Sequence, residues 1–310
     1  MNSYIPTLIE ALKKDDVRRE TEFKTGREAL YQNGVCIYKS SDEPICPDLI
    51  ETIKPEPELV LFGAGHVGKA VYDLSHMLGF SVTVLDEREE LLNEERFPRA
   101  RRIVMPYEEI FKSEFNFFRP YYLIFTHGHK YDKDALRYTL KHSASYRGMI
   151  GSKGKVKATL DSLKNEGFDE KLLSSVYSPI GLKIGAVTPE EIAVSIIAEI
   201  ISIYRSDKNM ITLSPNYLDS VKDEEGVAIR IVEKKGSAPR AIGSELMVTK
   251  SGKLFGTIGG GAIERVAIEE AKQIIKGKES VPLVKHYALN PSGDLGMICG
   301  GDVTLLFSMR

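Results

Sequence analysis

The chain is short of cysteine, of net charge and of long apolar runs, and each shortage excludes a class of protein. The three cysteines, Cys36, Cys46 and Cys299, have neither the spacing of a zinc site nor that of a disulfide framework. A net charge of −2 over 310 residues provides no overall field for nucleic acid or an acidic membrane. No apolar run reaches the roughly 18 residues of a membrane span, and the N-terminal stretch lacks the regions of a signal peptide. We therefore expect a cytoplasmic protein with no nucleic-acid or membrane partner.

The length and the order of the expected elements indicate two domains. Residues 59–206 alternate strand and helix patterns, which implies a parallel sheet with helices on both faces, and we assign residues 51–206 to this domain. Residues 207–310 form a smaller β-rich unit, and residues 1–50 are too few to hold a core alone. We expect these two ends to pack together, within one chain or across a homodimer. The predicted fold class is α/β: a Rossmann-like parallel-sheet domain plus a smaller α+β domain built from both chain ends.

Local signals place several boundaries. The segment 40–58 holds four prolines and many acids, and we interpret it as a linker. Residues 207–220 are interpreted as a connector. Thr188, Pro189 and Glu191 form the pattern of a capping box, so a helix is predicted to begin there.

A glycine-rich turn follows the first predicted strand of the parallel sheet. The segment 59–68, LVLFGAGHVG, has the G-x-G-x-x-G spacing of a dinucleotide-binding turn. The fingerprint glycines are Gly63, Gly65 and Gly68. The next strand ends at Asp86, where an acid that binds a ribose belongs, and Arg88 follows as a phosphate ligand or a surface charge. The turn predicts a nucleotide such as NAD(P); a tight turn without a ligand is the structural alternative.

Two histidines follow another strand of the same sheet. His127 and His129 belong to the segment THGHKYD and should lie at the carboxyl edge, where ligands bind in open α/β sheets. With Asp132 they could bind a metal, or they could act as general acid and base. His66, in the neighbouring turn, could join them. Loop histidines bonded to the backbone are the structural alternative.

A second glycine-rich corner lies in the smaller unit. Its consecutive glycines are Gly259, Gly260 and Gly261. Amides in such a corner can turn inward as an anion-binding nest, and the helix that follows adds its positive N-terminal end. Glu264 lies in the first turn of that helix. A tight turn without a ligand is again the alternative.

Two further segments of the smaller unit carry candidate ligand contacts. Ser237 and Arg240 end a strand, and arginine is a fork-shaped donor for phosphate or carboxylate. Cys299 stands beside Gly300 and Gly301, so a large ligand could reach its thiol. A thiolate there could bind a soft metal or carry sulfur, whereas a small buried cysteine is the structural alternative.

Taken together, these motifs resemble one family, the xanthine dehydrogenase accessory proteins called XdhC/CoxI. The first part of the resemblance covers residues 59–201 and includes LVLFGAGHVG, VTVLDER, THGH, GMIGSKGK and SPIGLKIGAVTPEEIAVSIIAEI. The second part covers about residues 226–305 and includes EKKGSAPRAIG, GTIGGGAIE and CGGDV.

The resemblance also shows departures. The family usually places the small domain first, so this chain resembles a permuted member, with residues 1–40 similar to the segment that normally follows the CGG strand. Gly259 stands where many relatives have serine, and Gly128 where an acid is common.

The resemblance implies a function in the maturation of molybdenum hydroxylases. It implies that the chain binds molybdenum cofactor, as molybdopterin or its dinucleotide form, and transfers it to an apo-enzyme of the xanthine dehydrogenase type. A cysteine desulfurase is an implied second partner, and Cys299 an implied ligand of the cofactor's molybdenum. The glycine turn at 63–68 keeps two other hypotheses open: an NAD(P)-dependent oxidoreductase and a nucleotide-sensing partner of the hydroxylase.

Overall fold

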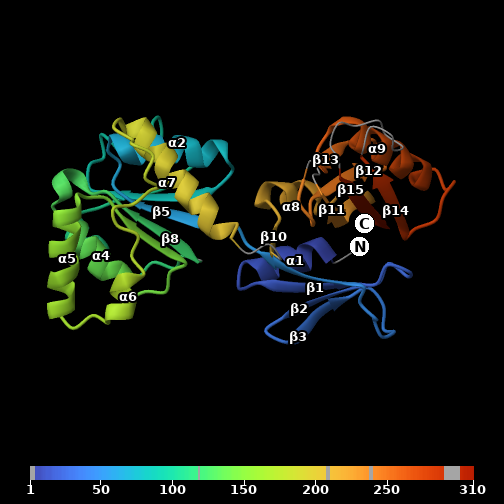
Figure 1. Cartoon of the computed structure of the whole chain (residues 1–310), viewed down its shortest axis with the longest axis horizontal. Coiled ribbons are helices and arrows are strands. Elements are labelled where there is room, and N and C mark those ends of the chain that lie inside the picture. Colours follow the sequence, from blue (N-terminus) through green and yellow to red (C-terminus); the bar gives the residue numbers. More distant parts are fainter. Residues whose placement is uncertain (1–3, 118, 207–209, 237–239, 290–300) are drawn as a thin grey trace. The chain divides into compact units, whose positions relative to one another are not determined.

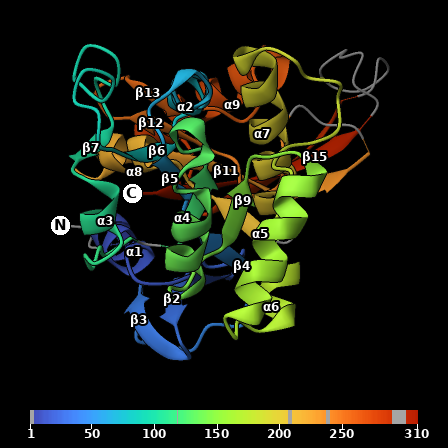
Figure 2. The same cartoon turned by 90° about the vertical axis from the view of Figure 1, so that its left-hand side faces the viewer.

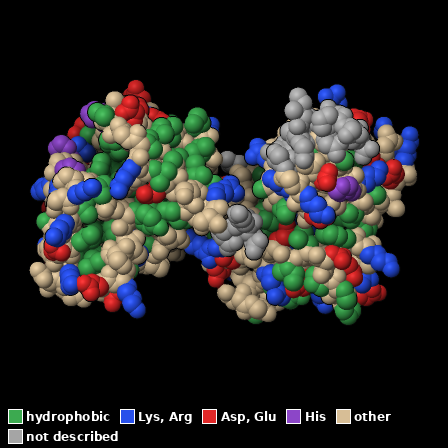
Figure 3. All heavy atoms as spheres, in the orientation of Figure 1, with side chains coloured by type: hydrophobic (Ala, Val, Ile, Leu, Met, Phe, Trp, Pro, Cys, Tyr) green, Lys and Arg blue, Asp and Glu red, His purple; other side chains and the backbone are tan. Residues whose placement is uncertain are grey.

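The structure, a computed structural model, describes residues 4–117, 119–206, 210–236, 240–289 and 301–310 (Figure 1). The chain divides into two compact units, one of Met1–Pro55 with Asn209–Arg310 and one of Glu56–Lys208. We call them the two-segment unit and the central unit. Among the described helices, none combines the length and the apolarity needed to cross a bilayer. On the face shown in Figure 3, acidic and basic side chains are interspersed over both units.

The central unit is a parallel sheet covered by helices on both faces, as the sequence predicts for residues 51–206. Its five strands are ordered β7-β6-β5-β8-β9, and every neighbouring pair is parallel. The strands are β5 (Glu58–Phe62), β6 (Ser81–Asp86), β7 (Arg101–Val104), β8 (Pro120–Ile124) and β9 (Tyr146–Met149). The helices are α2 (His66–Met77), α3 (Tyr107–Ile110), α4 (Asp132–Leu140), α5 (Lys153–Asn165), α6 (Glu170–Ser174) and α7 (Pro189–Tyr204).

Each face of this sheet has its own apolar core. Figures 1 and 2 show helices on both faces of the sheet. Leu59, Leu61 and Val84 belong to the core under α2 and α7, whereas Val60 and Phe62 belong to the core under α3 to α6. Buried residues therefore follow one another without alternation along β5, as expected for a strand covered on both sides.

The capping box predicted at Thr188 is confirmed. The Thr188 hydroxyl accepts a hydrogen bond from the Glu191 amide at 3.3 Å, and the Glu191 carboxylate accepts one from the Thr188 amide at 3.0 Å. Pro189 occupies the first helical position. These bonds satisfy amide groups that the first turn of α7 would otherwise leave without partners.

The two-segment unit contains two five-stranded sheets. The first, ordered β10-β4-β1-β2-β3, comes mainly from the N-terminal segment, and the second, ordered β13-β12-β11-β15-β14, comes wholly from the C-terminal segment. The first sheet consists of β1 (Val17–Thr21), β2 (Glu28–Gln32), β3 (Val35–Lys39), β4 (Leu49–Lys54) and β10 (Met210–Thr212). The second consists of β11 (Gly226–Lys235), β12 (Glu245–Thr249), β13 (Leu254–Gly256), β14 (Leu283–Ala288) and β15 (Asp302–Met309).

Three helices complete this unit: α1 (Tyr4–Leu12), α8 (Pro215–Val221) and α9 (Gly261–Ile275). Helix α9 packs on one face of the second sheet, around Val227, Ile229 and Phe307. A separate core joins α1 and α8 to residues of both sheets, including Leu30 and Met247. Segments that are distant in the sequence thus share one core.

Two sequence interpretations are wrong in this region. The proposed linker 40–58 contains β4, which pairs with both β1 and β10, and the proposed connector 207–220 contains β10 and most of α8. The acidic character of the first segment was misleading because Glu51 is buried and pairs with an arginine.

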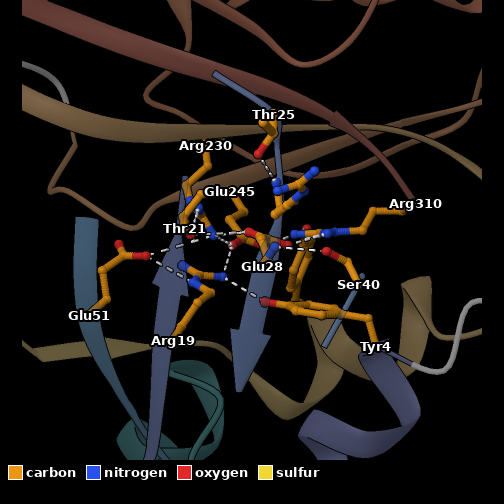
Figure 4. A network of polar contacts seen from close by, with 12 residues as sticks. Tyr4, Arg19, Thr21, Thr25, Glu28, Ser40, Glu51, Arg230, Glu245 and Arg310 are labelled. Atoms are coloured by element: carbon orange, nitrogen blue, oxygen red, sulfur yellow. Dashed lines mark hydrogen bonds and ion pairs between the residues drawn. The ribbon is translucent and has the colours of Figure 1, made fainter. Parts of the chain in front are cut away.

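A cluster of six charged side chains lies between the two sheets (Figure 4). It contains three arginines and three glutamates, so its formal charges balance: Arg19, Arg230, Arg310, Glu28, Glu51 and Glu245. We call it the intersheet cluster. Because it joins residues of the N-terminal segment to residues of the C-terminal segment, each segment completes the charge balance of the other.

The contacts of Arg19 show how tightly this cluster is built. Its guanidinium donates to Glu51 at 2.9 Å, to Glu245 at 2.7 Å and to the Tyr4 hydroxyl at 3.1 Å, and its side chain has no exposed surface. Opposite it, Arg230 lies 3.0 Å from Glu28. Some buried polar atoms of the cluster, including Arg19 Nη2, Glu51 Oε1 and Arg230 Nε, have no hydrogen-bond partner among the described residues, so the balance of opposite charges has to compensate for their burial.

Candidate functional site

The candidate site lies where the strand order of the parallel sheet reverses. The chain proceeds from β5 outward to β6 and β7, then returns to the other side of β5 to form β8 and β9. The turn after β5 and the turn after β8 therefore flank the point at the carboxyl edge where open α/β sheets bind ligands. These are the glycine turn, 63–68, and the histidine turn, 126–132.

Two of the three fingerprint glycines are required by the fold. Gly63 has a φ of +129°, and a Cβ there would overlap the carbonyl oxygen of Phe125. A Cβ on Gly68 would overlap the carbonyl oxygen of Gly63. Glycine at these two positions allows the backbones of β5, β8 and α2 to approach each other closely. A larger residue would prevent this approach.

Gly65 is different, because the fold does not require a glycine there. Its φ is −69°, which any residue adopts, and a Cβ built on it would meet no heavy atom of the described chain within 4 Å. Gly65 is also the N-cap of α2, and no side chain at this position accepts a hydrogen bond from the first amides of the helix. The backbone is therefore open to a ligand at the positive end of a twelve-residue helix.

Asp86 does not present the free carboxylate that the sequence predicts for a ribose contact. It has no exposed surface, and one of its oxygens accepts from the Ala64 amide at 2.7 Å. The Arg88 side chain bonds both oxygens, at 2.8 and 2.7 Å, and the Arg88 amide adds a further bond. Burial alone would raise the pKa of Asp86, but these hydrogen bonds outweigh it and lower the pKa. Asp86 therefore holds the glycine turn against β6.

The histidine turn is held in a strained conformation. Gly128 has a φ of +56°, and His129 has a φ of +61°, a left-handed value that costs a non-glycine residue about 1–3 kcal/mol. This backbone places His129 Nδ1 at 2.7 Å from Asp132 Oδ2. The His129 side chain is 42% exposed, whereas that of Asp132 is 2% exposed.

Asp132 is itself fixed by Thr126. Its Oδ1 accepts from the Thr126 amide at 3.0 Å and from the Thr126 hydroxyl at 2.7 Å. Its other oxygen faces His129, so all of its strong interactions lie within this turn. Sequence reasoning named Asp132 only as a possible metal ligand and missed its contact with Thr126.

The predicted metal site is not formed by the part of the chain described. Among those residues, no three side chains of His, Cys, Asp or Glu come together in a way that could hold a metal ion. His66 and His127 are both exposed. Asp132, the third member of the predicted set, uses its oxygens within the histidine turn.

A groove of about 280 Å³ begins beside the glycine turn. It lies along α2 and the start of α7, and its lining includes His66, Lys69, Asp73, Arg96, Glu190 and Val194. His66, the first residue of α2, therefore belongs to this groove. The lining carries charges of both signs and also three aliphatic side chains, Ala70, Leu74 and Val194, so it can contact both the polar and the apolar parts of a ligand.

The glycine corner of the two-segment unit is not an open anion nest. One oxygen of Glu264 accepts from the Thr257 hydroxyl at 2.5 Å, from the Ile258 amide at 2.9 Å and from the Gly260 amide at 3.1 Å. The Gly259 amide donates to Thr257. The chain's own carboxylate thus occupies the position predicted for a ligand anion, and hydrogen bonds from Thr257 and these amides lower the pKa of Glu264 in spite of its burial.

The remaining predicted contacts are only partly described. Ser237, Cys299 and Gly300 lie outside the described residues, so the predicted thiol site at Cys299 stays a prediction. Arg240 is exposed, and Gly301 is buried with its carbonyl oxygen bonded to the Leu289 amide.

Comparison with known proteins finds the same two regions. A family model described as the XdhC Rossmann domain matches residues 59–200, and one described as the XdhC and CoxI family matches residues 221–288. The Rossmann model therefore precedes the other along this chain.

The relatives bear related descriptions. A Bacillus subtilis protein described as a probable subunit of xanthine dehydrogenase is 37% identical over 153 residues, which cover 49% of this chain and 44% of that protein. The molybdenum cofactor insertion chaperone PaoD of Escherichia coli is 30% identical over 79 residues, 26% of this chain and 24% of that protein. The chain thus spans less than half the length of these curated relatives.

A solved structure supports the same assignment. The crystal structure of a xanthine dehydrogenase from Bacillus halodurans aligns with a TM-score of 0.55 at 25% identity. The alignment covers 65% of this chain and 66% of that one. With its fold, its motifs and both family models in agreement, the chain belongs to the XdhC and CoxI family.

Proposed function

We propose that this chain is an accessory protein that binds molybdenum cofactor and transfers it to a molybdenum hydroxylase of the xanthine dehydrogenase type. Family membership supports this proposal, as does the similarity to a relative described as a molybdenum cofactor insertion chaperone. The similarity to proteins described as xanthine dehydrogenase components supports the choice of client.

The observation that carries the proposal is the open backbone at Gly65. Molybdenum cofactor would bring an anionic phosphate, or a pyrophosphate in its dinucleotide form, and a metal bound by sulfur. A phosphate group fits the amides at the start of α2, because the helix dipole and the missing Cβ at Gly65 both favour an anion there. We therefore assign the phosphate to the glycine turn rather than to Gly259–Gly261, where Glu264 competes with it.

The two-segment unit carries its own candidate contacts for an anionic group and for a soft metal. Arg240 is exposed and can donate two parallel hydrogen bonds to an anionic group. Cys299 is the proposed ligand for the soft metal, since thiolates prefer such metals. In this scheme the chain's residues hold and shield the cofactor and perform no turnover chemistry. A cysteine desulfurase, as a second partner, would act before transfer.

The NAD(P)-dependent oxidoreductase is the second candidate, because the glycine turn suits any pyrophosphate. The position of Asp86 weighs against it: its carboxylate, which would bind the adenosine ribose of NAD, is bonded to Arg88 and Ala64.

Binding measurements on a matched pair of variants test the proposal. Gly65→Asp places a negative charge in the open position without a predicted clash. Gly154→Asp makes the same change in the first turn of α5, where a Cβ also meets nothing within 4 Å of the described chain. Anaerobic titration should use molybdenum cofactor released from a purified hydroxylase, and separately NADH and NADPH.

We expect the released cofactor to bind the unmodified protein and the Gly154→Asp variant, and to lose at least tenfold in affinity with Gly65→Asp. Reconstitution of apo-hydroxylase should fall in parallel. NADH or NADPH binding with turnover, and no affinity for the cofactor, would replace the proposal with an oxidoreductase. Equal cofactor binding by all three proteins would refute the location at Gly65.

A further inference from the structure

The histidine turn carries an exposed imidazole that the surrounding residues hold in one orientation. His129 adopts a left-handed backbone conformation, which is uncommon for residues other than glycine, although histidine adopts it more often than most. The contact that this conformation makes possible is the 2.7 Å bond between Nδ1 and Asp132. Relaxing the backbone would break this bond to a buried carboxylate, so the conformation and the bond together fix the position of the ring.

The bonds to Asp132 also determine the histidine's tautomer. An ionised carboxylate only accepts hydrogen bonds, so Nδ1 of His129 must carry the proton in this pair. In the neutral ring, Nε2 then has a free lone pair and can only accept. Because Nδ1 faces the buried carboxylate, Nε2 lies on the side of the ring away from Asp132, and the His129 side chain as a whole is 42% exposed.

We propose that His129 is a ligand-contacting residue whose Nε2 accepts a hydrogen bond from an N–H or O–H group of the bound ligand, and that Asp132 is its positioning residue. The inference rests on the proposed site at the glycine turn, since β5 and β8 are neighbours in the sheet and the histidine turn follows β8 at the same edge. Both a pterin ring and a nucleotide ribose carry such donors close to a phosphate.

The arrangement around Asp132 makes one substitution informative. In Asp132→Asn, the amide and hydroxyl of Thr126 still require an acceptor, so the asparagine oxygen stays on Thr126 and its NH2 group turns toward His129. That NH2 can only donate, which forces the proton of the neutral ring from Nδ1 to Nε2. The variant therefore changes Nε2 from an acceptor to a donor while the shape of the side chain is kept.

The test combines nitrogen NMR with two ligands. Imidazole ¹⁵N shifts are recorded on the full chain at about pH 8.5, above the ordinary imidazole pKa of about 6.5. The probes are ADP-ribose, which carries a pyrophosphate and ribose hydroxyls, and released molybdenum cofactor, which carries a pterin. The variants are Asp132→Asn and His129→Asn, since asparagine tolerates the left-handed conformation. His142→Asn, in the same unit, is the control.

We expect the neutral His129 ring to carry its proton on Nδ1 in the unmodified protein and on Nε2 in the Asp132→Asn variant. Binding of at least one probe should shift the ¹⁵N signal of His129 Nε2. Affinity for that probe should fall at least about tenfold in Asp132→Asn and His129→Asn and stay unchanged in His142→Asn. A probe that binds without moving His129 overturns this inference alone, as does an Nε2–H ring in the unmodified protein. If ADP-ribose shifts the His129 signal and the released cofactor does not, the result supports the inference about His129 and overturns the proposed cofactor. Failure of both probes to bind overturns both.

Discussion

Replacing Arg19 by methionine should destabilise the two-segment unit far more than the same change at Arg18. Arg19 is buried and bonds Glu51, Glu245 and Tyr4, so its loss leaves two carboxylates with fewer partners in a region closed to water. Removing one member of a buried ion pair typically costs 3–5 kcal/mol. Arg18 pairs at the surface with Glu20, and exposed pairs contribute about 0–1 kcal/mol.

The assay is denaturant unfolding, monitored by hydrogen exchange of the β1 and β11 amides. These amides report the stability of the two-segment unit rather than that of the central unit. We expect a free-energy loss of about 3–5 kcal/mol for Arg19→Met and less than about 1 kcal/mol for Arg18→Met. The double variant Arg19→Met, Glu245→Leu should lose less than the sum of its two single variants, because it removes both members of a pair. Equal losses for Arg18→Met and Arg19→Met, or strict additivity, would show that the intersheet cluster does not stabilise the unit as argued.

Three further predictions concern stability. Burial would raise the pKa of Glu28, but Arg310 and Arg230 outweigh it and lower the pKa from 4.5 to about 2. Its contribution, about 3 kcal/mol, is present above pH 4.5 and disappears as the pH falls toward 2; acid unfolding of the two-segment unit should show this loss, and Glu28→Gln should remove it. Glu264→Ala should cost about 1–2 kcal/mol because it leaves amides in the glycine corner without a partner; thermal unfolding checks this, with a smaller loss expected for Glu264→Gln. Gly68→Ala should unfold the central unit at lower temperature than Gly65→Ala, since only the former overlaps the backbone; equal transition temperatures would contradict the division of roles among these glycines.

The central unit could be predicted from the sequence because its signals are local. A strand covered on both faces is a continuous apolar run such as LVLF, and a capping box is four adjacent residues. The glycine turn was predictable for the same reason. The hydrogen bonds of Asp86 were not, because an acid at the end of a strand can face a ligand or its own loop without any change in the sequence pattern.

The two-segment unit was harder, because its charged residues are buried. Arg19 occupies an inward position of β1, and Glu51 does so in β4, where a sequence pattern predicts apolar residues. Their partners are far away in the chain, so no short-range pattern indicates the burial. Glu264 was similarly ambiguous: its carboxylate is close enough in sequence to reach the glycine corner, yet only the fold shows that it does.

The separation of Arg19 and Glu245, 226 residues along the chain, has a consequence for biosynthesis. At translation rates of about 5–20 residues per second, the first strands would emerge from the ribosome roughly 10–45 seconds before the strand that neutralises them. During that interval the nascent N-terminal sheet has charged residues on the face that will become its interior, which keeps that face soluble and discourages premature association with other chains. The ion pairs that join the mature unit can form only after the C-terminal segment that carries their partners has been made.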